Sequence, residues 1–151
     1  MAEDARYRTR FYLSSYILDA NLTKDDDATE VDWISQYTYP PYPLKRIFFE
    51  PKNVDLIFNI DTPVTTPRLD FDGSIIGYNE KVPILIQCVT KQGITGNKLR
   101  WKADAELRRV VETYPLGSYR SISRAEPFDT RMGNWIIYGI KDVLTHERDT
   151  T

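Results

Sequence analysis

The chain contains one histidine and one cysteine, His146 and Cys88, so few side chains are available for nucleophilic catalysis. A nucleophilic triad needs a base, usually histidine, beside its nucleophile. His146 lies near the end of the sequence, where we expect a solvated side chain. Cys88 lies among apolar residues of an expected strand, where a cysteine behaves as a small hydrophobe. We therefore predict no catalytic nucleophile, and these counts exclude a multi-cysteine or multi-histidine metal site within one chain.

Carboxylates followed by a lysine on a strand are typical of metal-assisted nucleases. An expected strand that ends at Lys91 follows four acidic residues, Asp61, Asp70, Asp72 and Glu80. The nuclease pattern needs an acid two residues before the lysine, and Val89 occupies that position. The pattern therefore fails at its most informative residue. A glycosidase-like pair stays open, because any two of the 22 acidic residues can meet in the folded chain.

A segment with two glycines, Gly93–Lys98, follows one expected strand and precedes an expected helix. Phosphate-binding loops are glycine-rich turns of this kind. The segment has neither the GxxxxGK[ST] nor the GxGxxG spacing, so we interpret it as a turn. We expect no cofactor.

Basic residues gather in two places that could bind nucleic acid. Near the start these are Arg6, Arg8 and Arg10 with the aromatic residues Tyr7 and Phe11; on the expected helix they are Lys98, Arg100, Lys102, Arg108 and Arg109. With 20 basic and 22 acidic residues the formal charge is -2, which excludes a generally basic nucleic-acid coat. Solvated faces or protein contacts explain the same residues, so a small nucleic-acid-binding domain stays an alternative.

The 151 residues suit one domain, 1–151, with 41% hydrophobic and 13% aromatic residues for its core. No apolar run approaches the roughly 18 to 20 residues of a membrane span. The first residues, MAEDARYRTR, do not resemble a secretory signal, so we expect a cytoplasmic setting.

Hydrophobic periodicity predicts an α+β fold, a mostly antiparallel β-sheet with one main amphipathic helix packed on it. The helix is expected over about 97–114, capped by Thr95 or Asn97, with an apolar stripe of Leu99, Ala103, Leu107, Val110, Val111 and Tyr114. Strands are expected at 54–61, 81–92 (central, with Pro83 at its beginning), 118–127 and 134–148. A hairpin is expected around Asp72-Gly73, because that dipeptide suits a tight turn.

The remaining segments are less regular. The first half of 1–22 favours a strand by its residue types, although a helical spacing also fits. Residues 62–70 are expected to form a Pro-punctuated connection, 128–134 a turn, and about 147–151 a frayed tail.

A Pro- and Tyr-rich segment over about 23–51 predicts an extended N-terminal arm. Pro40, Pro41, Pro43 and Pro51 exclude a continuous helix or a central strand, and a short strand is expected at Arg46–Glu50. Such an arm either docks on a partner or wraps its own domain. Whether residues 1–50 order before assembly stays open at this point.

The order of elements over residues 69–148 resembles a known family. The strand VPILIQCVTKQ is followed by a Gly/Thr turn, the helix NKLRWKADAELRRVVETY, the strand SYRSISRAEP and the long strand NWIIYGIKDVLTHER. This order is similar to that of the small tail-terminator and tail-completion (neck) proteins of long-tailed bacteriophages. The Pro- and Tyr-rich arm departs from the compact pattern of that family.

The resemblance implies a virion structural protein with no catalytic residues, assembled in the host cytoplasm. It implies a homohexameric ring that caps the tail tube protein and joins head–tail connector proteins, with DNA only as cargo in the lumen and no membrane partner. A head–tail connector or another tail component is the alternative. We expect inter-subunit contacts from Trp33, Tyr37, Tyr39, Tyr42 and Phe48, and from the helix face that carries Arg100 and Arg108.

Overall fold

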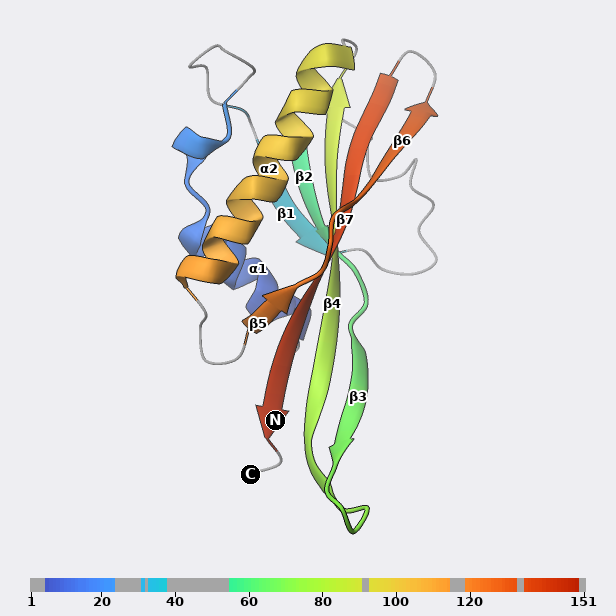
Figure 1. Ribbon diagram of the computed structural model, residues 1–151. Helices are drawn as coiled ribbons and strands as arrows, with labels where there is room; N and C mark the ends of the chain where they lie inside the picture. Colours follow the sequence, from blue (N-terminus) through green and yellow to red (C-terminus); the bar gives the residue numbers. More distant parts are fainter. Residues whose placement is uncertain are drawn as a thin grey trace.

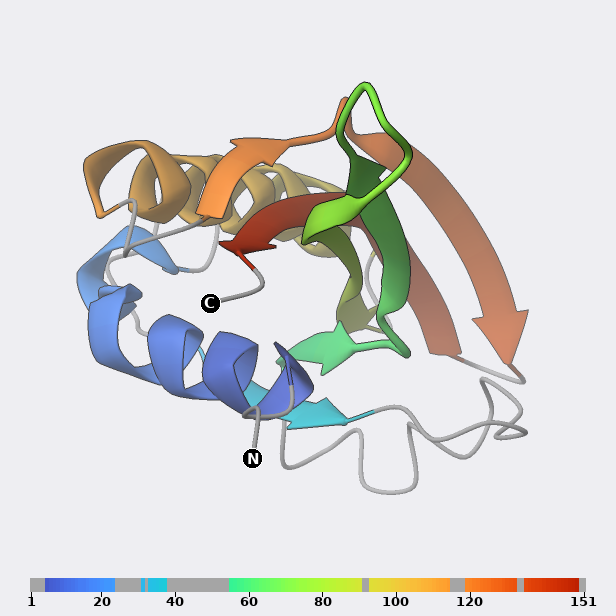
Figure 2. The same ribbon diagram turned by 90° about the horizontal axis from the view of Figure 1, so that it is seen from below.

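The computed structural model describes residues 5–23, 31, 33–37, 55–90, 93–114, 119–132 and 135–149. In chain order the elements are α1 (Ala5–Tyr16), the 3-10 helix η1 (Asp19–Asn21), β1 (Trp33–Tyr37), β2 (Leu56–Ile60), β3 (Val64–Leu69), β4 (Ile75–Thr90), α2 (Gly93–Thr113), β5 (Tyr119–Ile122), β6 (Glu126–Met132) and β7 (Trp135–Asp149). The strands form one sheet, and both α-helices lie on the same face of it (Figures 1 and 2).

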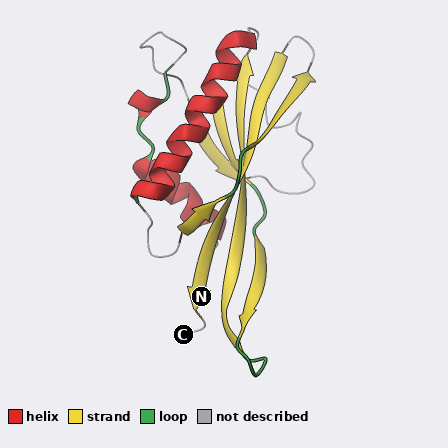
Figure 3. Ribbon diagram, in the orientation of Figure 1, coloured by secondary structure: helices red, strands yellow, loops and turns green. Residues whose placement is uncertain are grey.

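Two long antiparallel strands, β4 and β7, form the centre of the sheet, which has the order β1-β2-β4-β7-β5. Each of them is long enough to pair with two shorter strands on its outer edge. β4 pairs with β2 and β3, and β7 pairs with β5 and β6 (Figure 3). Only the β1–β2 pair is parallel among the described strands. The predicted α+β class, mostly antiparallel with a helix packed on the sheet, is confirmed.

The core lies between the helices and the side chains that alternate along the central strands. On β4 these are Ile84, Ile86 and Cys88, each at most 1% exposed. They meet the apolar stripe of α2, of which Leu99, Ala103, Leu107, Val110 and Val111 are buried, as the helical spacing predicts. Burial of each large aliphatic side chain is worth roughly 1.5–3 kcal/mol. This packing holds α2 along the sheet.

The N-terminal segment is a helix, so the preference for a strand in the first half of 1–22 was wrong. Thr9, Tyr12, Leu13 and Ile17 are all buried and recur at three- and four-residue spacing. The Tyr12 hydroxyl also donates to the Val110 carbonyl oxygen at 3.0 Å, which ties α1 to α2. Packing of this stripe outweighs the strand preference of Tyr, Phe and Thr.

Prolines misled the prediction at two strands. Residues 64–69, predicted as a connection, form β3. Pro67 is tolerated there because β3 lies at an edge and pairs, among the described strands, with β4 alone. Pro83 lies inside β4 instead of at its beginning. It falls between the residues that pair with β3 and those that pair with β2, and its carbonyl oxygen accepts from the Asp61 amide on that edge. An N–H at this position would point to the same edge, so its absence leaves the hydrogen bonds between β4 and β7 intact.

Three further boundaries differ from the prediction. The expected strand 118–127 is two strands, β5 and β6, and β6 includes most of the expected turn at 128–134. Helix α2 begins at Gly93, before the expected caps Thr95 and Asn97. β7 continues to Asp149, into the expected frayed tail, because β4 pairs with it as far as Gly77.

Within the predicted arm, residues 33–37 form β1, an edge strand that pairs in parallel with β2. The strand expected at Arg46–Glu50 lies outside the described residues.

Candidate functional site

The hairpin formed by β3 and β4 extends beyond the layer of helices and presents apolar side chains to solvent (Figure 1). Leu69 is 60% exposed, Ile75 47% and Ile76 46%, and Phe71 is fully exposed. We call residues 69–76 the hairpin tip. Exposed apolar side chains gathered on one projection mark a surface for contact with another macromolecule. Sequence reasoning missed this site, although a phenylalanine between two aspartates in a turn was a usable signal.

A network of local hydrogen bonds fixes the shape of the hairpin tip. Gly73 has a φ of 86°, in the left-handed region that glycine tolerates, which confirms the predicted turn at Asp72-Gly73. The Gly73 amide donates to the Asp70 carbonyl oxygen at 2.9 Å, and the Asp70 amide donates to that of Ser74 at 2.8 Å. The Asp72 carboxylate accepts from the Ser74 hydroxyl and amide, which lowers the pKa of Asp72. The tip therefore presents Phe71 in a preorganised turn.

Arg100, predicted as a contact residue, lies between α2 and strands β6 and β7. Its guanidinium donates to the carbonyl oxygens of Phe128 at 3.2 Å and Gly139 at 3.4 Å, and it forms an ion pair with Asp129. Its side chain is 11% exposed, and the guanidinium carbon lies 5.4 Å from the centre of the Tyr138 ring. These contacts hold α2 on the sheet, so Arg100 has a clear intramolecular role.

Arg108, the second predicted contact residue on α2, joins two buried carboxylates. It pairs with Asp104 at 3.0 Å on the same helix and with Asp142 of β7 at 3.1 Å, and it donates to the Ser123 carbonyl oxygen at 2.7 Å. Asp142 is fully buried. Among the described residues, Asp104 Oδ1 and Asp142 Oδ2 are buried without a hydrogen-bond partner. A proton shared between the two carboxyl groups would satisfy both oxygens.

The titration of Asp142 agrees with a shared proton. The pKa of Asp142 is raised to about 8, first by burial and then by a hydrogen bond to Asp104 and the charge of Asp104, while Arg108 opposes the shift. The folded chain therefore holds a proton that the unfolded chain releases near its ordinary value of 3.8. The stability from this group is fully present below that value and is lost as the pH rises to about 8.

We expect Asp142→Asn to remove this pH dependence. The asparagine amide donates permanently to Asp104 and its oxygen still accepts from Arg108, so it copies the protonated acid. The variant should nearly match the parent near pH 4 and exceed its free energy of unfolding by several kcal/mol at pH 8, because each unit of the pKa shift is worth about 1.4 kcal/mol. Urea unfolding at a series of pH values measures the difference, and a constant difference across that range contradicts a proton shared by Asp104 and Asp142.

The predicted aromatic contact residues have different positions. Trp33 is half-buried in β1, donates from Nε1 to Asp19 at 2.6 Å and meets the Phe58 ring edge-on at 5.6 Å. It therefore packs against its own domain. Tyr37 is the last residue of β1. Three predicted residues, Tyr39, Tyr42 and Phe48, lie outside the described residues, so their roles stay predictions.

The residues considered for catalysis are separated in the structure. His146 is 5% exposed, which corrects the expected solvated side chain; its Nδ1 lies 3.9 Å from Glu80, its register partner on β4. Cys88 is buried as predicted, and burial raises the pKa of its thiol, so it is not an activated nucleophile. In the described part of the chain, no group of three or more His, Cys, Asp or Glu residues could hold a metal ion.

The predicted basic stripe of Arg6, Arg8 and Arg10 is divided by the helical conformation of α1. Arg8 donates to Glu80 at 3.2 Å, toward the sheet, whereas Arg10 is exposed. Residues two apart on a helix point to different sides, so Arg8 and Arg10 do not form the alternating stripe that a strand would present. The hypothesis that this segment binds nucleic acid therefore loses the row of aligned arginines on which it was based.

No protein-family model matches this chain, and no curated protein matches its sequence. No helix within the described ranges is both long and apolar enough to cross a bilayer.

Proposed function

We propose that this chain is a virion structural protein of a tailed phage, of the tail-terminator or tail-completion type. In this role the chain forms a ring that caps the tail tube and joins it to the head connector, and its mechanism is assembly. The observation that carries the proposal is the hairpin tip, an apolar and preorganised projection suited to protein contact. The order β4, α2, β5, β6 and β7 supports it, because the resemblance to that family rests on a strand, a helix and two following strands, an order that the chain keeps with one additional strand, β6.

Native mass spectrometry over a wide range of concentrations tests this proposal. We expect a closed oligomer near six times the chain mass of 17.6 kDa. A ring uses head-to-tail interfaces that close, so it gives one discrete oligomer, whereas open contacts give a ladder of sizes. A ladder without a preferred size would contradict the ring. A connector role within the same class predicts instead that the chain binds head proteins and not the tail tube.

The double variant Tyr39→Ala/Tyr42→Ala separates arm contacts from folding in the same experiment. We expect weaker assembly with an unchanged thermal unfolding midpoint, because the predicted arm contacts a neighbour. A fall in the midpoint would mean that these tyrosines pack on their own domain. The matched control is Leu18→Ser, which removes an apolar side chain that is 52% exposed beyond the end of α1 and should leave both assembly and the midpoint unchanged.

A further inference from the structure

We propose that the hairpin tip of one copy docks on the outer face of α1 in the next copy, with Phe71 filling a hollow on that helix. The inference rests on the proposed function and deepens it, because it names the contact that joins neighbouring subunits. The partner is a second copy of this chain.

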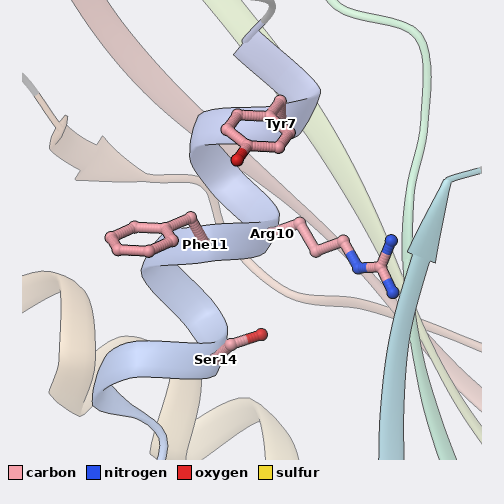
Figure 4. Close-up of a pocket in the computed structure, with 4 residues that line it drawn as sticks. All are labelled: Tyr7, Arg10, Phe11 and Ser14. Carbon is pink, nitrogen blue, oxygen red and sulfur yellow. The ribbon is translucent and has the colours of Figure 1, made fainter.

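The receiving surface is a hollow of about 220 Å³ on α1, lined by Tyr7, Arg10, Phe11 and Ser14, which we call the α1 hollow. These residues are three or four positions apart, so they share one face of the helix. Figure 4 shows Phe11 extending to one side and Arg10 to the other, with Tyr7 and Ser14 between them. Tyr7 is 57% exposed and Phe11 65%, so the hollow offers aromatic surface to a partner.

The entering surface is apolar and aromatic, as is much of the lining of the α1 hollow. Phe71 stands fully exposed at the end of a projecting hairpin, with Leu69 and Ile75 beside it. An aromatic side chain that fills a pocket on a partner is the usual anchor of a protein interface. Aromatic rings in contact also add about 0.5–1.5 kcal/mol beyond the area that they bury. Tyr7 and Phe11 can supply such contacts to Phe71.

The charges at the two surfaces are opposite. Asp70 and Asp72 flank Phe71, and hydrogen bonds from Ser74 hold the pKa of Asp72 below its usual range, so this carboxylate stays ionised. Arg10 carries a positive charge at the rim of the α1 hollow. Its guanidinium has five N–H donors, enough to reach a carboxylate of the incoming tip in addition to its contacts within its own chain. The two aspartates would repel the phosphates of a nucleic acid, so the tip fits a positively charged protein surface such as the α1 hollow of a second copy.

The two surfaces lie on different parts of the molecule, so the contact is head-to-tail. Figures 1 and 2 place the end of the β3–β4 hairpin well away from α1. When a projection meets a pocket elsewhere on an identical subunit, the growing assembly keeps one free tip at one end and one free hollow at the other. Such contacts continue until they close into a ring or extend as a filament. The inferred contact therefore supplies the kind of interface that a ring requires.

Two single variants and their mixture test the contact by native mass spectrometry. Phe71→Ala removes the anchor from the tip, and Phe11→Glu places a negative charge in the hollow, where it opposes Asp70 and Asp72. Each variant should lose the oligomer. In the mixture, the intact tip of the Phe11→Glu chain meets the intact hollow of the Phe71→Ala chain, and the reverse contact is absent. We therefore expect a dimer with one copy of each variant and no larger species.

Controls separate this contact from folding and from the proposed function. Val64→Ala removes an apolar side chain that is 58% exposed on the same hairpin but at the far end of β3, and it should leave assembly intact. At concentrations low enough for the parent to be monomeric as well, thermal unfolding midpoints of all variants should equal that of the parent. An oligomer that survives Phe71→Ala overturns the contact, and the ring would then form through other surfaces. A parent chain that is monomeric throughout also overturns it, whereas the proposed function would then require assembly on the tail tube.

If the face of α1 that carries the α1 hollow binds nucleic acid instead, the same variants give a different result in a DNA-binding experiment. DNA binding at low salt that is lost in Arg10→Glu and kept in Phe71→Ala would assign the α1 hollow to nucleic acid and overturn the inference.

Discussion

Replacing Arg108 by methionine should cost the fold about 3–5 kcal/mol at pH 9, because it removes the cation from two buried carboxyl groups. Asp142 is fully buried, and its pKa of about 8 leaves it mostly ionised at that pH. Without Arg108 the pKa of Asp142 rises further. Above about pH 8 the parent has already lost the stability that the protonated Asp142 contributes, whereas the variant keeps losing it as the pH rises. The difference between the two should therefore widen above pH 8.

Urea unfolding of parent and variant from pH 6 to 9 measures this effect, with the range chosen to span the parent pKa. The matched control adds Asp142→Asn to the Arg108→Met chain. Because the asparagine carries no charge at any pH, the double variant should recover stability at the alkaline end and lose the widening difference. A variant that is equally destabilised at every pH, with or without Asp142→Asn, would mean that Arg108 contributes only its hydrogen bond to Ser123.

The elements that periodicity predicted well are those in which pattern and packing agree. The apolar stripe of α2 follows helical spacing, and the long apolar runs of β4 and β7 have neighbours on both sides. The elements that it missed are at the edges of the sheet. Pro67 in β3 and Pro127 in β6 lower the strand preference of their segments, yet each strand pairs on one side only within the described sheet. An edge strand tolerates proline, but whether a strand lies at an edge is a property of the whole fold and cannot be read from the residues of that strand.

The candidate sites show a similar division. The turn at Asp72-Gly73 was predictable because it depends on the residues of the turn itself. The exposure of Phe71 depends instead on how far the hairpin of β3 and β4 extends beyond the layer of helices. Asp142 left a clear signal in the sequence, since it alternates with Ile140 and Leu144 on the inward face of β7. A charged residue at a core position calls for a partner, and only the packing of α2 shows that Arg108 and Asp104 provide it.

Gly139→Val should destabilise the fold by about 3 kcal/mol, near the upper limit for overpacking. Gly139 on β7 lies directly opposite Phe128 on β6, and a Cβ built at Gly139 would overlap the Phe128 ring. The ring fills the space that the glycine leaves, an arrangement in which an aromatic side chain covers a strand glycine. Valine would displace the ring and disturb the two carbonyl oxygens, of Phe128 and Gly139, that Arg100 contacts. The thermal unfolding midpoint should fall by roughly 2–4 °C for each kcal/mol.

The variant Phe128→Ala provides the matched background. Removing the ring opens the space above residue 139, so Gly139→Val should cost little there, and its strand preference can even stabilise β7. The double-mutant cycle then gives a coupling of about 2 kcal/mol between the two positions. An equal cost of Gly139→Val in both backgrounds would show that the glycine is needed for its backbone and not for the ring. Because Arg100 links these same residues to α2, the coupled pair helps to determine how the helix is seated on the sheet that carries the hairpin.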